Sequence, residues 1–348
     1  MKKTLLAIGF ISTILSANAQ NVNIPDANFK TYLLGNTAIN TNGDSEIQFS
    51  EANSFTGQIN TNSISGIFDV TGIESFTSLT ELFLNQTQIS SLDVSANVNL
   101  DKLSCGWSDV SSLDISNNTS LTYLAIYSNL ITSIDLSNNP LLSQLWCYDL
   151  AISTLDLSNN PNLTVVYIPD NQLSMIDLSN NDLINNLTCS GNSITSLDLS
   201  NLTGLSHFTC NLTDLQSLDL RNGNNVNIIN NAINITNNPD LTCINVDDAA
   251  FSTANWTNID AIASFSENCL AGLEEPLITE LIVSPNPTLA NISVITTFAT
   301  NLEIKNINGM LIQQVPSNGA ITIDLTNFAS GVYFVRTSEG QTVKFIKE

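Results

Sequence analysis

The chain has 348 residues, enough for two or three domains, and its 32 acidic residues against nine basic ones give a formal net charge of −23 at pH 7. So acidic a surface repels nucleic acids and anionic membranes and favours cations or neutral polymers, which excludes nucleic acid as a partner. The imbalance lies in residues 20–278, which hold 27 acidic and three basic residues, whereas residues 279–348 are close to neutral.

The N-terminus has the pattern of a secretory signal peptide. Lys2 and Lys3 precede an apolar stretch over residues 5–15, which is followed by small residues that suit a cleavage site. This stretch is shorter than the roughly 18 apolar residues of a membrane anchor, and no later segment is long and apolar enough to span a bilayer. We therefore expect residues 1–19 to be a signal peptide that is removed after Ala19.

The pattern of residues 20–70 predicts a cap at the N-terminal end of the repeats. It includes an amphipathic helix over residues 25–34 with its own N-cap residue. The following loop, residues 40–51, has oxygen-bearing side chains at its first, third and fifth positions, Ile at its eighth and Glu at its twelfth. It resembles an EF-hand calcium loop, although Asn replaces Asp at the first position and Ser replaces Gly at the sixth. The resemblance implies weak Ca²⁺ binding, and the alternative is a polar turn in a helical cap. The implied ligands are Asn40, Asn42, Asp44, Glu46 and Glu51.

A short motif, Ser-Leu-Asp-(Val/Ile/Leu)-Ser, recurs with small variations so that its aspartates fall every 21 residues. A period this strict is typical of a stacked solenoid, in which one coil cannot bury its apolar face alone. The motif defines an Asp column: Asp93, Asp114, Asp135, Asp156, Asp177, Asp198 and Asp219. Each Asp lies between two inward residues, so the column faces solvent. We interpret it as serving construction and solubility, and loose binding of divalent cations is the alternative.

Each 21-residue unit also contains two copies of an apolar-x-apolar-x-x-Asn pattern, which predicts a short strand followed by a turn. The Asn amide both donates and accepts, so it can satisfy backbone groups that a tight coil leaves unpaired. One Asn column contains Asn97, Asn118, Asn139, Asn160 and Asn181, and a second contains Asn129, Asn171 and Asn192.

The longer pattern Leu-x-x-Leu-x-Leu-x-x-Asn-x-Ile, repeated over residues 71–242, resembles the leucine-rich repeat family. The resemblance implies a solenoid with 21-residue coils and parallel strands on its concave side. No helical periodicity separates the strands, so we expect a second set of strands on the convex side. The predicted fold class is thus a mostly-β leucine-rich repeat solenoid with a short helical N-terminal cap.

The six cysteines fall into two groups. Four occupy one position of the repeat, which Ile fills in other coils, and this favours buried small hydrophobic side chains. They are Cys105, Cys147, Cys189 and Cys210, of which the last two lie on adjacent coils and could bridge. Cys243 and Cys269 flank the end of the array, in a segment (residues 243–271) that we predict to cap it, and are the better disulfide candidates.

A linker over residues 272–278 precedes a small all-β, sandwich-like domain over residues 279–348, in which Asn308-Gly309 predicts a tight hairpin. This domain resembles the C-terminal sorting domain of type IX secretion, a system of Bacteroidetes. The resemblance implies contact with the secretion machinery, passage through the outer membrane, removal of the domain, and release or surface attachment. The segments that carry it are residues 283–287, 306–309, 331–335 and 343–347.

The sequence does not predict an enzyme. Its one histidine, His207, has no Cys or Ser placed as a nucleophile beside it, and no phosphate-binding glycine loop or paired catalytic carboxylates emerge.

The outward positions of the concave strands vary from coil to coil and gather aromatic residues, which are typical of recognition surfaces. We predict a non-catalytic recognition or adhesion protein that binds an extracellular protein or glycan there. The alternatives are that the rings only shield the strands, and that the protein is a structural spacer or coat component. The predicted contact residues are Trp107, Tyr123, Tyr127, Trp146, Tyr148 and Tyr167.

Overall fold

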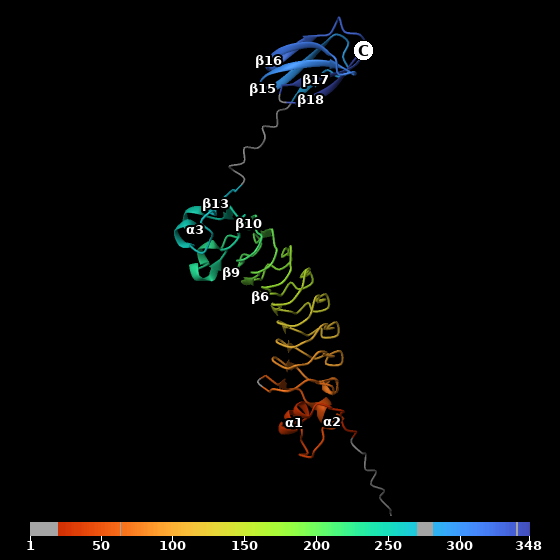
Figure 1. The fold of residues 1–348 in the computed structure, drawn as a ribbon, viewed down its shortest axis with the longest axis vertical. Coiled ribbons are helices and arrows are strands. Elements are labelled where there is room, and N and C mark those ends of the chain that lie inside the picture. Colours follow the sequence, from red (N-terminus) through yellow and green to blue (C-terminus); the bar gives the residue numbers. More distant parts are fainter. Residues whose placement is uncertain (1–19, 63, 270–280, 339) are drawn as a thin grey trace, which may run out of the picture. The chain divides into compact units, whose positions relative to one another are not determined.

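Figure 1 shows a computed structural model that describes residues 20–62, 64–269, 281–338 and 340–348. The chain divides into two compact units, Met1–Cys269 and Leu270–Glu348, and each is considered by itself below. The predicted signal peptide, residues 1–19, and the predicted linker, residues 272–278, lie outside the described residues. No helix in the described ranges has the length and apolar character needed to cross a membrane.

Two helices, α1 (Ala27–Gly35) and α2 (Phe49–Ser54), cover the first coil of the solenoid (Figure 1). The Asp26 carboxylate caps α1 by accepting hydrogen bonds from the backbone N–H groups of Asn28 and Phe29, both at 2.9 Å. Phe29 and Leu33 of this helix are fully buried. The predicted capped helix is therefore present, and its apolar face closes the open end of the array.

A nine-stranded parallel sheet runs along the solenoid, with one short strand from each coil. In the full strands the middle residue is apolar and buried, so the first and third residues face outward. The sheet begins at residue 58, which lies inside the predicted N-terminal cap. The repeats therefore start one coil before residue 71, where the sequence predicted their beginning. In spatial order its strands are β1 (Gln58–Asn60), β2 (Glu81–Phe83), β3 (Lys102–Ser104), β4 (Tyr123–Ala125), β5 (Gln144–Trp146), β6 (Val165–Tyr167), β7 (Asn186–Thr188), β9 (His207–Thr209) and β11 (Ile233–Asn234).

The expected second sheet forms at the C-terminal end of the array. It is parallel, in the order β13-β12-β10-β8, and its last strands continue through the segment predicted to cap the array. The corresponding segments of the earlier described coils carry no assigned strand. The strands are β8 (Ser196–Asp198), β10 (Ser217–Leu220), β12 (Cys243–Val246) and β13 (Ser264–Ser266), with helix α3 (Ala249–Asn255) between the last two. The described residues of this unit also form three short 3₁₀ helices: η1 (Ile73–Ser75), η2 (Asn225–Asn227) and η3 (Asn230–Ala232).

Buried asparagines join successive coils. The Asn139 side-chain nitrogen donates to the carbonyl oxygens of Ile115 and Asn118, at 3.2 and 2.9 Å, in the coil before it. The other four members of its column donate to equivalent carbonyls. In the second column, Asn129 donates to the Cys105 carbonyl at 2.8 Å and accepts from the Val110 N–H at 3.0 Å. The amides thus pair backbone groups that a turn buries.

The cysteine column is buried in the core between the two faces. Burial raises the pKa of Cys105 and of Cys147 to about 12, so these thiols stay protonated and behave as small apolar side chains. Cys189 and Cys210 occur as free thiols, although they lie on adjacent coils.

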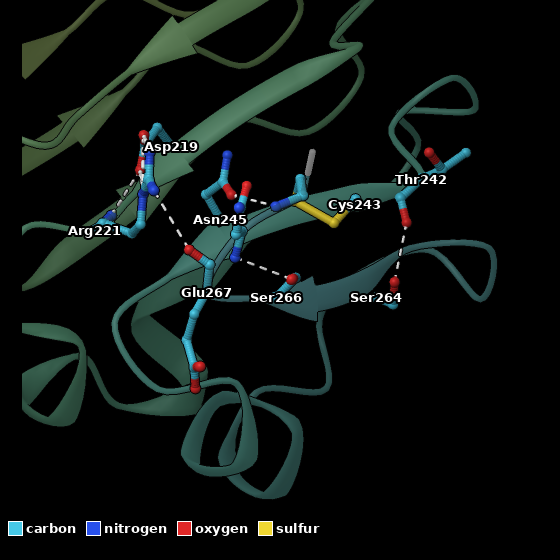
Figure 2. Close-up of a disulfide and its surroundings, with 10 residues drawn as sticks. Asp219, Arg221, Thr242, Cys243, Asn245, Ser264, Ser266 and Glu267 are labelled. Carbon is cyan, nitrogen blue, oxygen red and sulfur yellow. Dashed lines mark hydrogen bonds and ion pairs between the residues drawn. A yellow bond between two sulfur atoms is a disulfide. The ribbon is translucent and has the colours of Figure 1, made fainter. Parts of the chain in front are cut away.

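The end of the array is tied together by one disulfide and one arginine (Figure 2). Cys243 at the start of β12 is bonded to Cys269, whose N–H donates to the side-chain oxygen of Asn245 at 2.8 Å. Arg221 pairs with the Asp219 carboxylate and donates to the Glu267 carbonyl oxygen at 3.3 Å. These bonds hold the last strand, β13, against the end of the solenoid.

The second unit is an antiparallel sheet of five strands in the order β14-β15-β17-β18, with β16 also paired to β15. Its core contains Ile292, Ile304, Val335 and Phe345. Gly309 turns the chain between β15 and β16 with a φ of 78°, as the Asn-Gly pair predicts. The strands are β14 (Ile282–Ser284), β15 (Asn291–Asn306), β16 (Leu311–Asp324), β17 (Gly331–Thr337) and β18 (Thr342–Lys347).

Candidate functional site

Outward-facing aromatic side chains gather on the middle coils of the nine-stranded sheet. Tyr123 is the first residue of β4, and Trp146 and Tyr167 are the third residues of β5 and β6. Tyr127 and Tyr148 follow their strands by two residues and lie 21 positions apart, at the carboxyl edge of the same sheet. The repeat therefore stacks equivalent side chains at the coil spacing of about 4.8 Å.

Five of the six predicted contact residues form one continuous chain of ring contacts. The Tyr127 and Tyr148 rings are stacked, with centroids 4.5 Å apart and planes 7° from parallel. Trp107 meets Tyr127 edge-on at 5.0 Å, and Tyr167 contacts Tyr148 at 5.3 Å and Trp146 at 4.9 Å. We call these five side chains, Trp107, Tyr127, Tyr148, Tyr167 and Trp146, the aromatic ladder.

A glycine makes room for the ladder. Gly106 occupies in its coil the position that Tyr127 occupies in the next, and a Cβ at Gly106 would lie 2.2 Å from Tyr127 Cε2. The Tyr127 ring can thus lie over the backbone of the preceding coil only because residue 106 has no side chain. Sequence reasoning missed this residue, although its place in the tyrosine column was readable from the 21-residue period.

Burial differs along the ladder. Trp107 is 51% exposed, whereas the other four rings are partly covered by their neighbours. Burial raises the pKa of Tyr148, and the nearby tyrosines and the Asp149 carboxylate raise it further. Burial likewise raises the pKa of Tyr123 and of Tyr127. The phenols of Tyr123, Tyr127 and Tyr148 therefore stay neutral at physiological pH and can act as hydrogen-bond donors.

Beside the ladder runs a column of residues in the left-handed backbone region. Bulky side chains rarely adopt this conformation, which costs about 1–2 kcal/mol, whereas Asp tolerates it better. Trp107 adopts it with a φ of 53° while its N–H donates to the Tyr127 carbonyl oxygen at 3.0 Å. The strained conformation thus holds an exposed indole at the edge of the sheet. The left-handed column contains Gln86, Trp107, Ser128, Asp149, Asp170, Gly191 and Leu212.

Sequence reasoning also missed the left-handed column. Glycine is the usual signal for a left-handed residue, and one of its seven members is glycine. As a result, Asp149 and Asp170, both exposed, were not recognised as neighbours of the aromatic residues. Ser128 lies between Trp107 and Asp149 in this column, and its hydroxyl donates to the Asp149 carboxylate at 2.8 Å.

The loop predicted to bind calcium has its carboxylates engaged by its own hydrogen bonds. One Glu51 oxygen accepts from the Thr41 N–H, the Thr41 hydroxyl and the Asn42 N–H, and the other accepts from the Gln48 N–H. Burial alone would raise the pKa of Glu51, but these bonds hold it below its ordinary value. Glu51 is the N3 residue of the capping box at the start of α2, where its carboxylate accepts from the N–H of the N-cap residue, Gln48.

The remaining proposed calcium ligands are engaged in a similar way. Asn40 donates to the carbonyl oxygens of Leu34 and Asp44, the Asp44 side chain accepts from Asn42, and Glu46 pairs with Lys30 at 2.7 Å. The part of the chain that the structure describes holds no cluster of three or more His, Cys, Asp or Glu side chains able to hold a metal ion. Calcium binding by this loop stays a prediction, and a bound ion would have to compete with these internal hydrogen bonds.

The Asp column has a local structural use. Asp135 accepts a hydrogen bond from the N–H of Ser137, two residues on, at 2.9 Å, and the same contact recurs at each Asp of the column. Hydrogen bonds to the serine backbone and hydroxyl lower the pKa of Asp135 and Asp114. The carboxylates therefore turn the chain within each coil.

The fold and its repeated contacts define a leucine-rich repeat solenoid. Its most similar solved structures include an internalin (inlF) from Listeria monocytogenes, 20% identical, which covers 72% of this chain and 80% of the internalin chain with a TM-score of 0.52. An internalin C2 from the same species is 19% identical over 71% of this chain and 97% of its own, with a TM-score of 0.47. At these identities the likeness is one of fold alone. No curated protein matches the chain.

The C-terminal unit is identified by sequence. Residues 283–348 match the secretion system C-terminal sorting domain family. The chain is thus a leucine-rich repeat protein that carries a type IX secretion sorting domain, and this domain marks it for secretion or for the cell surface.

Proposed function

We propose that the mature protein is a non-catalytic recognition or adhesion protein that binds an extracellular protein or glycan through the aromatic ladder and Tyr123. The observation that carries this proposal is the continuous chain of five rings on the variable positions of an otherwise regular solenoid. Rigid aromatic side chains contribute large contact areas at a small loss of conformational entropy, which is why they dominate binding surfaces.

In this proposal, the two ends of the chain direct its export. The sorting domain engages the type IX secretion machinery, and residues 1–19 act as a signal peptide removed after Ala19. The sorting-domain match supports the first step, and the charged, apolar and small-residue pattern of the N-terminus supports the second. The repeat array would then face the outside of the cell or the medium.

The proposal is tested with the purified chain on a glycan array and on immobilised extracellular proteins, using wild type, Trp107→Ala and Leu212→Ala. Leu212 is the matched control, because it belongs to the same left-handed column and is 60% exposed but lies outside the ladder. We expect Trp107→Ala to lose binding at least ten-fold and Leu212→Ala to keep it. Equal binding by both variants would assign contact to another surface, and self-association of the wild type without a ligand would favour a structural coat.

A further inference from the structure

The acidic charge of the array is unneutralised beside the ladder. Residues 20–278 contain three basic residues, and each is already paired: Lys30 with Glu46, Lys102 with Glu81 and Arg221 with Asp219. None of these pairs involves Asp149 or Asp170, the exposed acids of the left-handed column, or Asp109, which is exposed two residues after Trp107. A cation that neutralises them must come from outside the array.

The charge around the exposed ring of the ladder favours a cation over a neutral sugar. Tyr127 and Tyr148 cover one face of each other, and Tyr167 is packed between Tyr148 and Trp146, so these rings are less open to a ligand than Trp107. Trp107 is the exposed ring of the ladder, and tryptophan is the aromatic side chain that attracts a guanidinium or ammonium group most strongly. Asp109 and Asp149 place negative charge on the same part of the array.

We propose that the aromatic ladder binds a basic segment of a partner protein, with one arginine or lysine on Trp107 and a second at Asp149 and Asp170. This rests on the proposed function and names its partner class. In the left-handed column, Asp149 and Asp170 lie two and three coils beyond Trp107, about 10 and 14 Å at the coil spacing. An extended segment advances about 14 Å in four residues, so basic residues at i and i+4 match the column. Charge complementarity over the acidic array steers the segment toward this edge.

The test uses two peptides of the sequence Gly-Xaa-Gly-Ser-Gly-Xaa-Gly, with capped ends and with Xaa either arginine or its uncharged analogue citrulline. Each is titrated by calorimetry into the purified chain at 50 mM and 500 mM salt. We expect the arginine peptide to bind at least ten-fold more tightly than the citrulline peptide at low salt, and this difference to shrink at high salt. Equal affinity for the two peptides overturns the proposal.

Substitutions distinguish binding at this surface from nonspecific attraction to the acidic array. Trp107→Ala and Asp149→Asn are each expected to weaken binding of the arginine peptide about five-fold, whereas Asp182→Asn leaves it unchanged. Asp182 is an exposed acid of the same array outside the left-handed column, so its loss removes one charge from the array without touching the ladder. An equal effect of Asp149→Asn and Asp182→Asn overturns the proposal, with far-ultraviolet circular dichroism confirming that each variant is folded.

The outcomes also separate this inference from the proposed function. If Trp107→Ala abolishes capture of an extracellular protein or glycan while the two peptides bind equally, the ladder is a recognition site but its partner is not a basic segment. If the arginine peptide binds equally well to Trp107→Ala and to wild type, the ladder is not the site, and the inference fails together with its premise.

Discussion

Two parts of the same solenoid differ in what neighbouring coils share. In the Asn column, each side chain donates to two backbone carbonyls of the preceding coil, so every member repeats one chemical task. In the aromatic ladder, the five side chains contact one another through their rings, and the residue type changes from coil to coil. The difference teaches that positions that pair backbone groups tolerate little change, whereas positions that contact one another by side chains alone can vary without opening the coil.

The sharpest test of this comparison is Asn139→Ala. The substitution removes two buried hydrogen bonds to the carbonyls of Ile115 and Asn118, which keep only their bonds from backbone N–H groups, and we expect this to cost about 1–3 kcal/mol of unfolding free energy. Asn138→Ala is the matched control, since Asn138 is the exposed neighbour, and should change stability by less than about 0.5 kcal/mol. Urea unfolding followed by circular dichroism measures both. Similar losses for the two variants would show that the Asn column is not what joins the coils.

A second substitution, Gly106→Ala, tests the ladder. Its Cβ would lie 2.2 Å from the Tyr127 ring, so the ring must move away from its stack with Tyr148. We expect a loss of about 1–2 kcal/mol and a weaker near-ultraviolet circular dichroism signal from the aromatic rings. Gly204→Ala is the control, because a Cβ there meets nothing within 4 Å and Gly204 does not have a left-handed φ. An unchanged aromatic signal in Gly106→Ala would contradict the proposed packing.

Acid should weaken the repeated Asp column and leave the ladder intact. Hydrogen bonds from serine hold the pKa of Asp114, Asp135, Asp156 and Asp177 below the ordinary value of 3.8 in the folded chain. A carboxylate with a lowered folded pKa contributes stability above its unfolded pKa and loses it as pH falls through its folded pKa. The melting temperature should therefore be level from pH 7 to about pH 5 and fall progressively below about pH 4. A fall that begins near pH 6 would point to other groups.

Calcium should have the smallest effect. All the hydrogen bonds to Glu51 come from the loop and the helix start, so we expect 5 mM Ca²⁺ and an excess of chelator to leave the melting temperature unchanged within error. The same measurement tests cation binding by the Asp column. A rise with Ca²⁺ that is absent in Glu51→Gln would establish the EF-hand-like site, and a rise that persists in that variant would move the site to the Asp column.

The comparison also explains what could be predicted of the candidate site. The six aromatic residues were predicted because the 21-residue period assigns each outward position to one column on the sheet. Five of them are in ring contact in the structure. The left-handed column was not found, since it depends on backbone geometry at the end of the strand, and Gly106 was missed although the period gave its position. In the sequence, the oxygen-bearing side chains of residues 40–51 have the spacing of calcium ligands. In the folded loop those oxygens face hydrogen-bond donors of the chain itself.

The sequence by itself determined the solenoid, its 21-residue coil, the buried Asn and Cys columns, the helical start and the sorting domain at the C-terminus. Because the coils stack at a fixed spacing, residues 21 positions apart contact one another, and the period of the sequence therefore specifies the core. Tertiary structure alone decided the backbone conformation at the carboxyl edge of the sheet. It placed Trp107, Asp149 and Asp170 in one left-handed column, where backbone hydrogen bonds between coils hold a conformation that most of these residues would not adopt in isolation.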